Sequence, residues 1–189
     1  MAMLEGSRAM IARRRFRVML VALIAVAPTA PVEGGAKPPQ TLAAVIDDAA
    51  RWARVPPDVL AAVVWVESRG YPWALNIRGE ALYPQSRAEA IILVRAARGR
   101  ADIGVAQIHY PTWGPVFGLR PEDLLDPWIN LHAAAAILRL VMTQEPDSWG
   151  GVGRYHSGTP LRKWAYARQV AYAVGALRPI PPQRVGPTP

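Results

Sequence analysis

Hydrophobic positions along the chain recur mostly with the spacing of α-helices, and proline and glycine residues separate the runs. Residues 42–54 form the first amphipathic run, with Thr41 in the position of an N-cap. Residues 58–68 form a second run that is apolar on almost every side, which is typical of a buried helix. Further helices are predicted over residues 87–98, 127–143, 148–155 and 160–176.

Two segments between these helices depart from the helical pattern. Residues 73–84 alternate apolar and polar positions around Arg78 and Gly79, which predicts a small β-hairpin. Residues 101–120 contain three glycines and are predicted to be mainly loop, with one brief helix over residues 104–109 and a short surface helix near Glu122. The predicted fold class is therefore mainly α, with one small hairpin.

Composition narrows the class of protein. A chain of 189 residues suffices for one domain with a real core. The absence of cysteine excludes disulfides, thiolate nucleophiles and cysteine-ligated zinc. The net charge is +8, but almost every basic residue is arginine, with lysine only at positions 37 and 163. This bias often reflects genome composition, and no nucleic-acid-binding motif accompanies it, so we expect no nucleic-acid partner.

The first 36 residues have the pattern of an export signal. Basic residues between Arg13 and Arg17 precede an apolar run over residues 18–27, which is too short to span a bilayer comfortably. Cleavage after Ala36 is acceptable, and a retained N-terminal membrane anchor is the alternative. We therefore expect an exported protein, periplasmic or associated with the cell envelope. Residues 37–41 are predicted to be a linker, residues 42–178 the functional domain, and residues 179–189 a disordered proline-rich tail.

Glu67 is the one residue of the second helix that does not fit its apolar setting. Helical spacing stacks it on the face that carries Leu60, Val63 and Val64. Partial desolvation there raises the pKa of a carboxyl group, and a proton held near neutral pH is what a general acid requires. The alternative is a solvated glutamate at a helix end, although the C-terminus of a helix disfavours negative charge.

Three short motifs give this glutamate a context. Glu67-Ser68, then GVAQI over residues 104–108, then GRYH over residues 153–156 occur in that order. This set resembles the soluble lytic transglycosylase family, whose pattern is Glu-Ser, Gly-Leu-Met-Gln-Ile and Ala-x-x-Tyr-Asn. The resemblance spans roughly residues 42–175 and implies a goose-lysozyme-like α fold. Ala106 stands where the family has methionine, and His156 stands where it has asparagine.

The resemblance also suggests a cellular setting. The stretches WALNIRGEALYPQSRAEA, ADIGVAQI, LLDPWINLHAAAAIL and GRYHSGTP resemble the branch that accompanies conjugation and type III or type IV secretion machines. The implied partners are the glycan strands of peptidoglycan and components of such a machine. No cofactor is implied. The three histidines, at positions 109, 132 and 156, lie too far apart for a metal-ligand spacing, so no metal site is expected.

The family reaction implies a single catalytic acid and base, Glu67, that leaves a 1,6-anhydromuramyl end. Ser68 would position substrate or Glu67, and Gln107 has an amide suited to an N-acetyl group or to water. Tyr155 would orient Glu67 through its hydroxyl or line the sugar cleft. Asn76 and His156 are further candidates for substrate contact, with a turn role and a structural role as the respective alternatives.

Several alternatives remain open at this stage. Asp102 is the only candidate for a second catalytic carboxylate, which would favour a lysozyme-type hydrolase of the same fold. A component that binds peptidoglycan without cutting it is a third possibility. Trp65 and Trp73 are candidates for stacking on sugar rings, although Trp65 is expected to belong to the core.

Overall fold

The computed structural model describes residues 41–177. The predicted signal segment and most of the predicted linker lie outside the described residues, as does the proline-rich tail. The observed elements, in chain order, are α2 Leu42–Ala53, α3 Pro57–Ser68, β1 Leu75–Ile77, β2 Glu80–Leu82, α4 Arg87–Ala96, β3 Asp102–Ile103, β4 Ile108–His109, α5 Tyr110–Phe117, the 3₁₀ helix η1 Pro121–Leu125, α6 Pro127–Gln144, α7 Ser148–His156 and α8 Pro160–Leu177.

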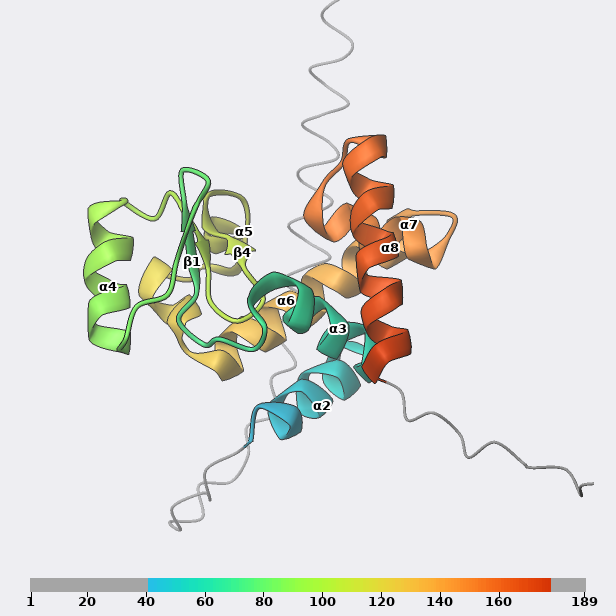
Figure 1. Ribbon diagram of the computed structural model, residues 1–189, viewed down its shortest axis with the longest axis horizontal. Helices are drawn as coiled ribbons and strands as arrows, with labels where there is room; N and C mark the ends of the chain where they lie inside the picture. Colours follow the sequence, from blue (N-terminus) through green and yellow to red (C-terminus); the bar gives the residue numbers. More distant parts are fainter. Residues whose placement is uncertain (1–40, 178–189) are drawn as a thin grey trace, which may run out of the picture.

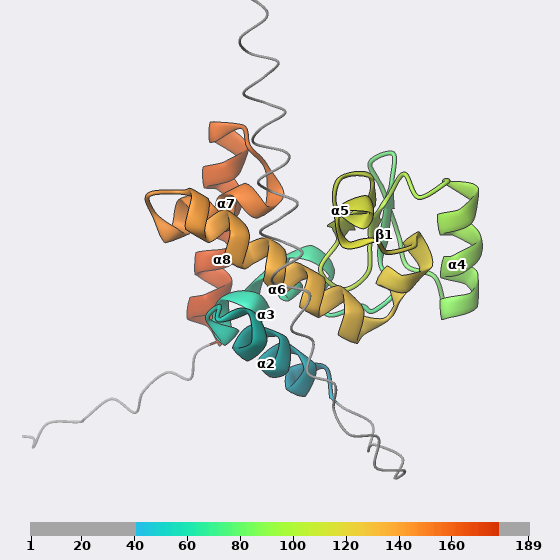
Figure 2. The same ribbon diagram turned by 180° about the vertical axis from the view of Figure 1, so that it is seen from behind.

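The mainly α fold class is confirmed, and α6 forms its axis. Residues 133–138 of this helix are all buried, which explains why its sequence is apolar on most sides. Helices α2 and α7 pack on α6, and α8 packs on both α3 and α7. In Figures 1 and 2 the sheet and α4 lie on one side of the molecule, α7 and α8 lie on the other, and α6 runs between them.

The small sheet is larger than the predicted hairpin. Strands β1 and β2 pair antiparallel around Arg78 and Gly79, as predicted, but β1 also pairs with β3, which in turn pairs with β4. The predicted brief helix over residues 104–109 is wrong. Gly104 and Gln107 have φ of +80° and +47°, which a helix does not accept, and the segment between them forms the turn from β3 to β4.

The predicted loop character of residues 101–120 is also wrong in its second half, which is helix α5. Pro111 lies in its first turn and Gly118 ends it with φ of +68°. Tyr110 explains the glycine inside this helix: a Cβ at Gly114 would overlap the tyrosine ring. The Tyr110 hydroxyl also donates to the carbonyl oxygen of Leu119 at 3.2 Å, so the ring closes the turn that follows α5.

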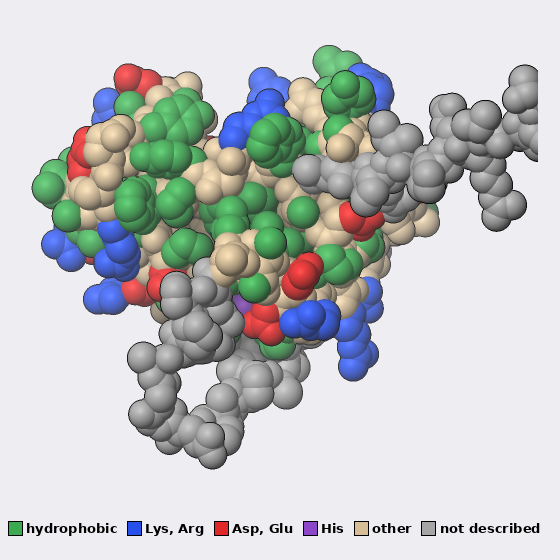
Figure 3. Space-filling model, turned by 60° about the horizontal axis from the view of Figure 1, so that its bottom comes forward, with side chains coloured by type: hydrophobic (Ala, Val, Ile, Leu, Met, Phe, Trp, Pro, Cys, Tyr) green, Lys and Arg blue, Asp and Glu red, His purple; other side chains and the backbone are tan. Residues whose placement is uncertain are grey.

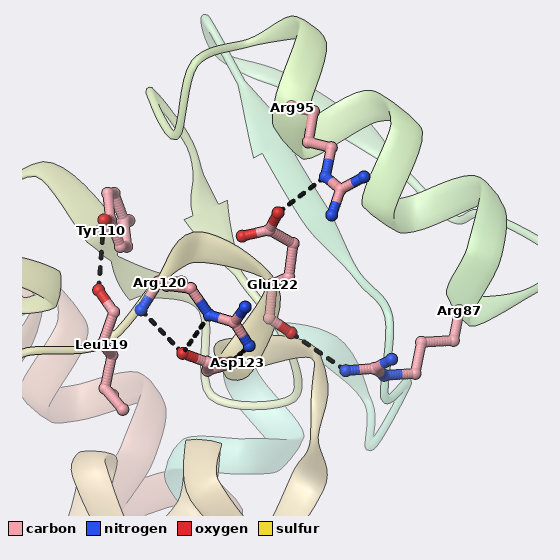
Figure 4. A network of polar contacts seen from close by, with 7 residues as sticks. All are labelled: Arg87, Arg95, Tyr110, Leu119, Arg120, Glu122 and Asp123. Atoms are coloured by element: carbon pink, nitrogen blue, oxygen red, sulfur yellow. Dashed lines mark hydrogen bonds and ion pairs between the residues drawn. The ribbon is translucent and has the colours of Figure 1, made fainter.

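Ionic contacts attach α4 to η1 at the outer end of the sheet (Figure 4). Arg95 Nε donates to Glu122 Oε1 at 2.7 Å, and Arg87 Nη2 donates to the Glu122 carbonyl oxygen at 3.3 Å. Within η1, Arg120 and Asp123 pair at 2.7 Å. The three arginines are exposed and the two carboxylates are partly buried, so each contact adds only modest free energy, and the two contacts of Glu122 fix α4 beside the sheet. Within the described part of the chain, no helix is long and apolar enough to cross a membrane.

Candidate active site

Glu67 occupies the last turn of α3 and opens into a cavity of about 480 Å³ between the two sides of the molecule. The helix ends one residue later, at Ser68, because Arg69 adopts the left-handed conformation at the C-cap. From the sheet side the cavity is lined by Asn76, Asp102, Gln107 and His109; from the helical side by Tyr155, His156 and Arg162. Segments distant in sequence therefore meet around one carboxyl group.

The environment of Glu67 favours its protonated form near neutral pH. Desolvation by the surrounding apolar residues is the main cause, and it raises the pKa of Glu67 from 4.5 to about 7. The Tyr166 hydroxyl donates to Glu67 Oε1 at 2.6 Å, which stabilises the carboxylate and opposes the rise. The negative charge of Asp102 across the cavity adds to the rise. The group can therefore both give up and regain a proton under physiological conditions.

Tyr166 is a site residue that the sequence did not reveal. It lies on the buried face of α8, 99 residues after Glu67, and only 4% of its surface is exposed. One feature of the sequence could have indicated it: the Tyr166 hydroxyl lies on the helix face of the apolar residues Ala167, Val170 and Ala173, and a buried hydroxyl requires a hydrogen-bond partner. His156 stacks on its ring at a centroid distance of 4.8 Å. Burial and the nearby Glu67 charge raise the pKa of Tyr166 well above 10, so it remains a donor.

Tyr155 was expected to orient Glu67 through its hydroxyl or to line the sugar cleft, and the structure gives the first of these contacts to Tyr166 instead. The Tyr155 hydroxyl donates to the carbonyl oxygen of Ala106 at 2.9 Å. Its ring lines the cavity and lies parallel to Tyr166, with centroids 6.5 Å apart. Tyr155 therefore joins α7 to the turn that carries Gln107.

Gln107 projects into the cavity with its amide nitrogen already bound. Nε2 donates to the carbonyl oxygens of Ala74 and Gly104, both at 2.9 Å. Both amide hydrogens are therefore used, and the amide oxygen is left as an acceptor that can meet an N–H group of a ligand. The backbone of Gln107 is left-handed, with φ of +47°.

Ser68 does not reach the cavity. It is buried, and its hydroxyl donates to the carbonyl oxygen of Val105 at 2.6 Å while accepting from the backbone N–H of Gly70 at 3.2 Å. Ser68 was expected to position substrate or Glu67, and its hydrogen bonds fit the second of these roles. It fixes the turn of residues 104–107 against the end of α3, directly beside Glu67.

Asn76 has the turn role that was one of its two expected roles, and its position on the cavity leaves contact with substrate as a prediction. Its Oδ1 accepts the backbone N–H of Gly79 at 2.9 Å, which closes the hairpin turn, while the residue also lines the cavity. Its amide nitrogen has no hydrogen bond to the residues that the structure describes, so it can donate to a ligand. His156, exposed at the end of α7, lines the same cavity.

The two tryptophan candidates lie elsewhere. The prediction that Trp65 belongs to the core is wrong: 45% of its surface is exposed, and the Arg69 guanidinium lies 4.7 Å from its ring centroid. Trp73 packs against the core and meets Tyr71 edge to face. Neither residue lines the cavity. Trp113 of α5 does line it, and nothing in the spacing of the sequence distinguished that tryptophan from the others.

Asp102 faces the cavity from the first residue of β3 and has a partner of its own. Its Oδ1 lies 2.8 Å from His109 Nδ1, at the paired position on β4. Asp102 is thus the only carboxyl group besides Glu67 among the residues that line the cavity. Among the described residues, no group of three or more His, Cys, Asp and Glu side chains could hold a metal ion.

Comparison with known proteins gives this arrangement a family context. The family model described as "Transglycosylase SLT domain" matches residues 44–174, which is most of the chain. A curated relative, the X polypeptide of Escherichia coli (strain K12), is 28% identical over 133 residues, covering 70% of this chain and 69% of that protein. A second X polypeptide of Escherichia coli is 27% identical over the same shares. No solved structure matches.

Proposed function

The chain belongs to the transglycosylase SLT domain family, and from this membership and the cavity we infer that it is a peptidoglycan lytic transglycosylase with Glu67 as its catalytic acid and base. The observation that carries the proposal is the state of Glu67: a desolvated carboxyl group with a pKa of about 7, hydrogen-bonded to Tyr166 and open to a cavity of substrate size. The family membership supports peptidoglycan as the substrate class.

The proposed reaction begins with proton donation. Glu67 gives its proton to the glycosidic oxygen between N-acetylmuramic acid and N-acetylglucosamine as the bond from that oxygen to C1 breaks. The carbonyl oxygen of the muramyl N-acetyl group stabilises the cationic C1. The Glu67 carboxylate then accepts the proton of the C6 hydroxyl, whose oxygen bonds to C1. The product carries a 1,6-anhydromuramyl end, Glu67 is protonated again, and no water is consumed.

The surrounding groups suit this cycle. Tyr166 donates to the Glu67 carboxylate, so it stabilises the charged state that exists between the two proton transfers. The free amide oxygen of Gln107 is an acceptor for the N–H of an acetamido group, and the Asn76 amide nitrogen is a donor for a hydroxyl or carbonyl oxygen. These contacts with substrate are part of the proposal.

One observation favours a second candidate, a lysozyme-type hydrolase. Asp102 faces the same cavity as Glu67 and is paired with His109, and such a carboxylate could activate a water molecule. The hydrolase would leave a reducing muramic acid in place of the anhydro end. The third candidate, a non-catalytic binding component, has no use for a desolvated acid, whose burial lowers stability at neutral pH.

Activity against whole peptidoglycan tests the proposal. Wild type should release soluble glycan fragments from purified sacculi, and Glu67→Gln should lose at least about a thousandfold in rate because it removes the proposed proton donor. Asp47→Asn, at an exposed carboxylate of α2, is the matched control and should behave as wild type. If Glu67→Gln cleaves as fast as wild type, Glu67 is not the acid. If neither cleaves while both bind sacculi, the binding component is the better account.

Location and partners extend the proposal. The basic and apolar pattern of residues 1–36 supports export to the periplasm or cell envelope, where the substrate lies, and the motif resemblance supports local opening of the wall for a conjugation or secretion machine. The mass of the chain recovered from the periplasm tests the export step. Cleavage after Ala36 predicts an N-terminus at Lys37; an uncleaved chain in the membrane fraction would indicate the anchor instead.

A further inference from the structure

The imidazole of His156 lies flat on the ring of Tyr166, the side chain that donates to Glu67. The two ring planes are 6° apart and the ring centroids are 4.8 Å apart, which is a stacked arrangement. His156 ends α7 and Tyr166 lies on α8, so the stack joins two helices that pack against each other (Figure 1). No hydrogen bond or ion pair joins the imidazole to any residue that the structure describes, so stacking is the specific contact that holds it.

The position of the Tyr166 hydroxyl decides whether Glu67 keeps its hydrogen bond. The hydroxyl donates to Glu67 Oε1 at 2.6 Å and to no other residue that the structure describes. Because the hydroxyl lies at the far end of the ring from Cβ, a tilt of the ring moves it further than it moves the ring centre. A contact that fixes the plane of the ring therefore also fixes the hydrogen bond. The exposed imidazole of His156 is such a contact on the buried ring of Tyr166.

Tyr155 supports the Tyr166 ring less directly. The two tyrosine rings are also nearly parallel, but their centroids are 6.5 Å apart, compared with 4.8 Å for His156. The Tyr155 hydroxyl donates to the carbonyl oxygen of Ala106, so this side chain is held by the β3–β4 turn. His156 is therefore the closer aromatic partner of Tyr166.

The end of α7 is held closely against α8, which keeps the imidazole in place. Gly153 lies one turn before His156, and a Cβ at this position would overlap the carbonyl oxygen of Lys163 on α8. The glycine therefore allows an approach of the two helices that a larger residue would prevent. Since Tyr155 also ties α7 to the β3–β4 turn, the backbone that carries the imidazole is fixed from two sides.

We propose that His156 is a positioning residue, whose ring holds the Tyr166 hydroxyl against Glu67 by stacking. This inference rests on the proposed function, in which Tyr166 stabilises the Glu67 carboxylate between the two proton transfers. Asparagine, the residue that the family pattern has at position 156, offers hydrogen-bonding groups but no ring. This chain has a flat ring there instead, and the proposal assigns the role to that ring and not to its nitrogen atoms.

Two substitutions separate the ring from its polar atoms. His156→Phe keeps a flat ring and removes both nitrogens, whereas His156→Asn keeps hydrogen-bonding groups and removes the ring. On soluble glycan strands, His156→Phe should stay within about twofold of wild type. His156→Asn should lose about three- to tenfold in kcat with KM unchanged, the range set by one aromatic stack.

Equal losses in the two variants would overturn the proposal. Equal losses with a raised KM would show that the imidazole nitrogens contact the substrate. Equal losses in kcat alone would show that the charge or the hydrogen bonding of the imidazole acts in the reaction. General attraction of the substrate does not enter this comparison, because both variants lose the same imidazole and lysine and arginine side chains are scattered over several parts of the surface (Figure 3).

A double-mutant cycle tests whether the effect passes through Tyr166. Tyr166→Phe keeps the lower ring of the stack and removes the hydroxyl that the stack holds. In this background His156→Asn should cost nothing further in kcat, because the hydrogen bond to Glu67 is already absent. The same loss as in the wild-type background would overturn the proposal and place the action of His156 elsewhere in the cavity.

Titration of Glu67 keeps this inference separate from the proposed reaction. The NMR signal of the Glu67 carboxyl carbon is followed in the full chain without substrate. His156→Asn should raise the midpoint above about 7, in the direction expected for Tyr166→Phe, because the carboxylate loses a donor. His156→Phe should leave it in place. The other titratable groups that line the cavity are the same in both variants: Tyr83, Asp102, His109, Tyr155 and Arg162.

Each result of the titration decides one of the two proposals. A midpoint that falls in His156→Asn would overturn the positioning role, because entry of water would then outweigh the loss of the donor. The predicted rise without cleavage of any glycan by wild type would refute the proposed reaction but retain the positioning role. Cleavage that requires Glu67, with the same midpoint in wild type and His156→Asn, would do the reverse.

Discussion

At the scale of single residues, the chemistry depends on the balance of two influences on Glu67. Desolvation raises its pKa and the Tyr166 hydroxyl lowers it, and the outcome is a pKa of about 7. A glutamate with only the first influence would keep its proton too firmly to act as a base in the second half of the cycle. The proton exchange proposed for Glu67 therefore depends on Tyr166, whose own pKa is raised well above 10, so that it stays protonated at neutral pH.

Removal of the Tyr166 hydroxyl tests this balance. Tyr166→Phe deletes a hydrogen bond to the charged form of Glu67, so the pKa of Glu67 should rise above about 7 and the alkaline fall in the pH–rate profile should move to higher pH. The maximal rate should drop roughly ten- to a hundredfold, as expected for the loss of a charged hydrogen bond. Tyr172→Phe, exposed on the same helix, is the control. An unchanged pH profile with a lower melting temperature would reduce Tyr166 to a packing role.

The raised pKa also has a consequence for stability. Between pH 4.5 and about 7 the unfolded chain has released this proton while the native chain retains it, so the free energy of unfolding falls as pH rises through that window. Above about pH 7 the loss is complete, at roughly 3 kcal/mol. Glu67→Gln removes the cost. Its melting temperature should exceed that of wild type at pH 8, and the difference should vanish near pH 4. Equal melting temperatures at both pH values would contradict the desolvation of Glu67.

The sequence predicted the roles of site residues that lie in a recognisable local pattern. It did not predict the roles of residues whose hydrogen-bond partner is distant in the chain. The apolar spacing around Glu67 predicted its raised pKa, and the motif order led to Gln107. Tyr166 approaches from α8, and Ser68 is held by Val105, 37 residues away. Both contacts depend on how helices pack, which periodicity alone does not determine.

At the scale of elements, the turn between β3 and β4 is the part on which the site depends most. Side chains from three helices hold this turn. The Ser68 hydroxyl of α3 donates to the Val105 carbonyl oxygen, and the Tyr155 hydroxyl of α7 donates to the Ala106 carbonyl oxygen. The Asn130 amide of α6 accepts from the Ala106 N–H and donates to the Ile103 carbonyl oxygen. The turn leaves little room, because a Cβ at Gly104 would overlap the Asn130 amide and the Leu124 carbonyl oxygen. A helix was predicted here because short apolar runs do not distinguish a turn between strands from a helix.

Asn130 is the central support of this turn. Although fully buried, it donates from Nδ2 to the carbonyl oxygens of Ile103 and Leu124, both at 2.8 Å, and accepts from the Ala106 N–H at 2.9 Å. Asn130→Ala leaves three backbone groups without partners, so the free energy of unfolding should fall by about 3 kcal/mol or more. Chemical denaturation measures this, with exposed Gln144→Ala on the same helix as control. A loss below about 1 kcal/mol would show that the turn does not need Asn130.

Elements with explicit capping signals were predicted closely. Thr41 and Ser86 accept from the backbone N–H groups of Ala44 and Glu89, as their positions indicated, and Asp126 caps α6 through two backbone N–H groups. Strands β3 and β4 were missed because each has only two residues. Their place in the sheet comes from the pairing of β3 with β1, which is distant in sequence, and β4 then pairs with β3. Local rules therefore gave the helices other than α5, and long-range pairing decided the strands β3 and β4.

At the scale of the whole molecule, the site exists only because the two sides meet. The acid comes from the helical side with Tyr166, while Gln107 and Asn76 come from the sheet side. Asp102 also comes from the sheet side, and it is the group that would turn a transglycosylase into a hydrolase. The two proposed reactions differ in whether the substrate C6 hydroxyl or a water molecule attacks C1. The product shows which one occurred, because the first leaves an anhydro end and the second a reducing end.

The origin of the oxygen on C1 of the product is the most direct test of the account. Peptidoglycan is digested by wild type and by Asp102→Asn in water enriched with heavy oxygen. The masses of the muropeptides released in the two digests are then compared by mass spectrometry. Glu67 working alone predicts anhydromuramyl products that are lighter by one water and carry no heavy oxygen, from wild type and Asp102→Asn alike. Reducing muramic ends that carry heavy oxygen, and that depend on Asp102, would contradict it and establish a hydrolase.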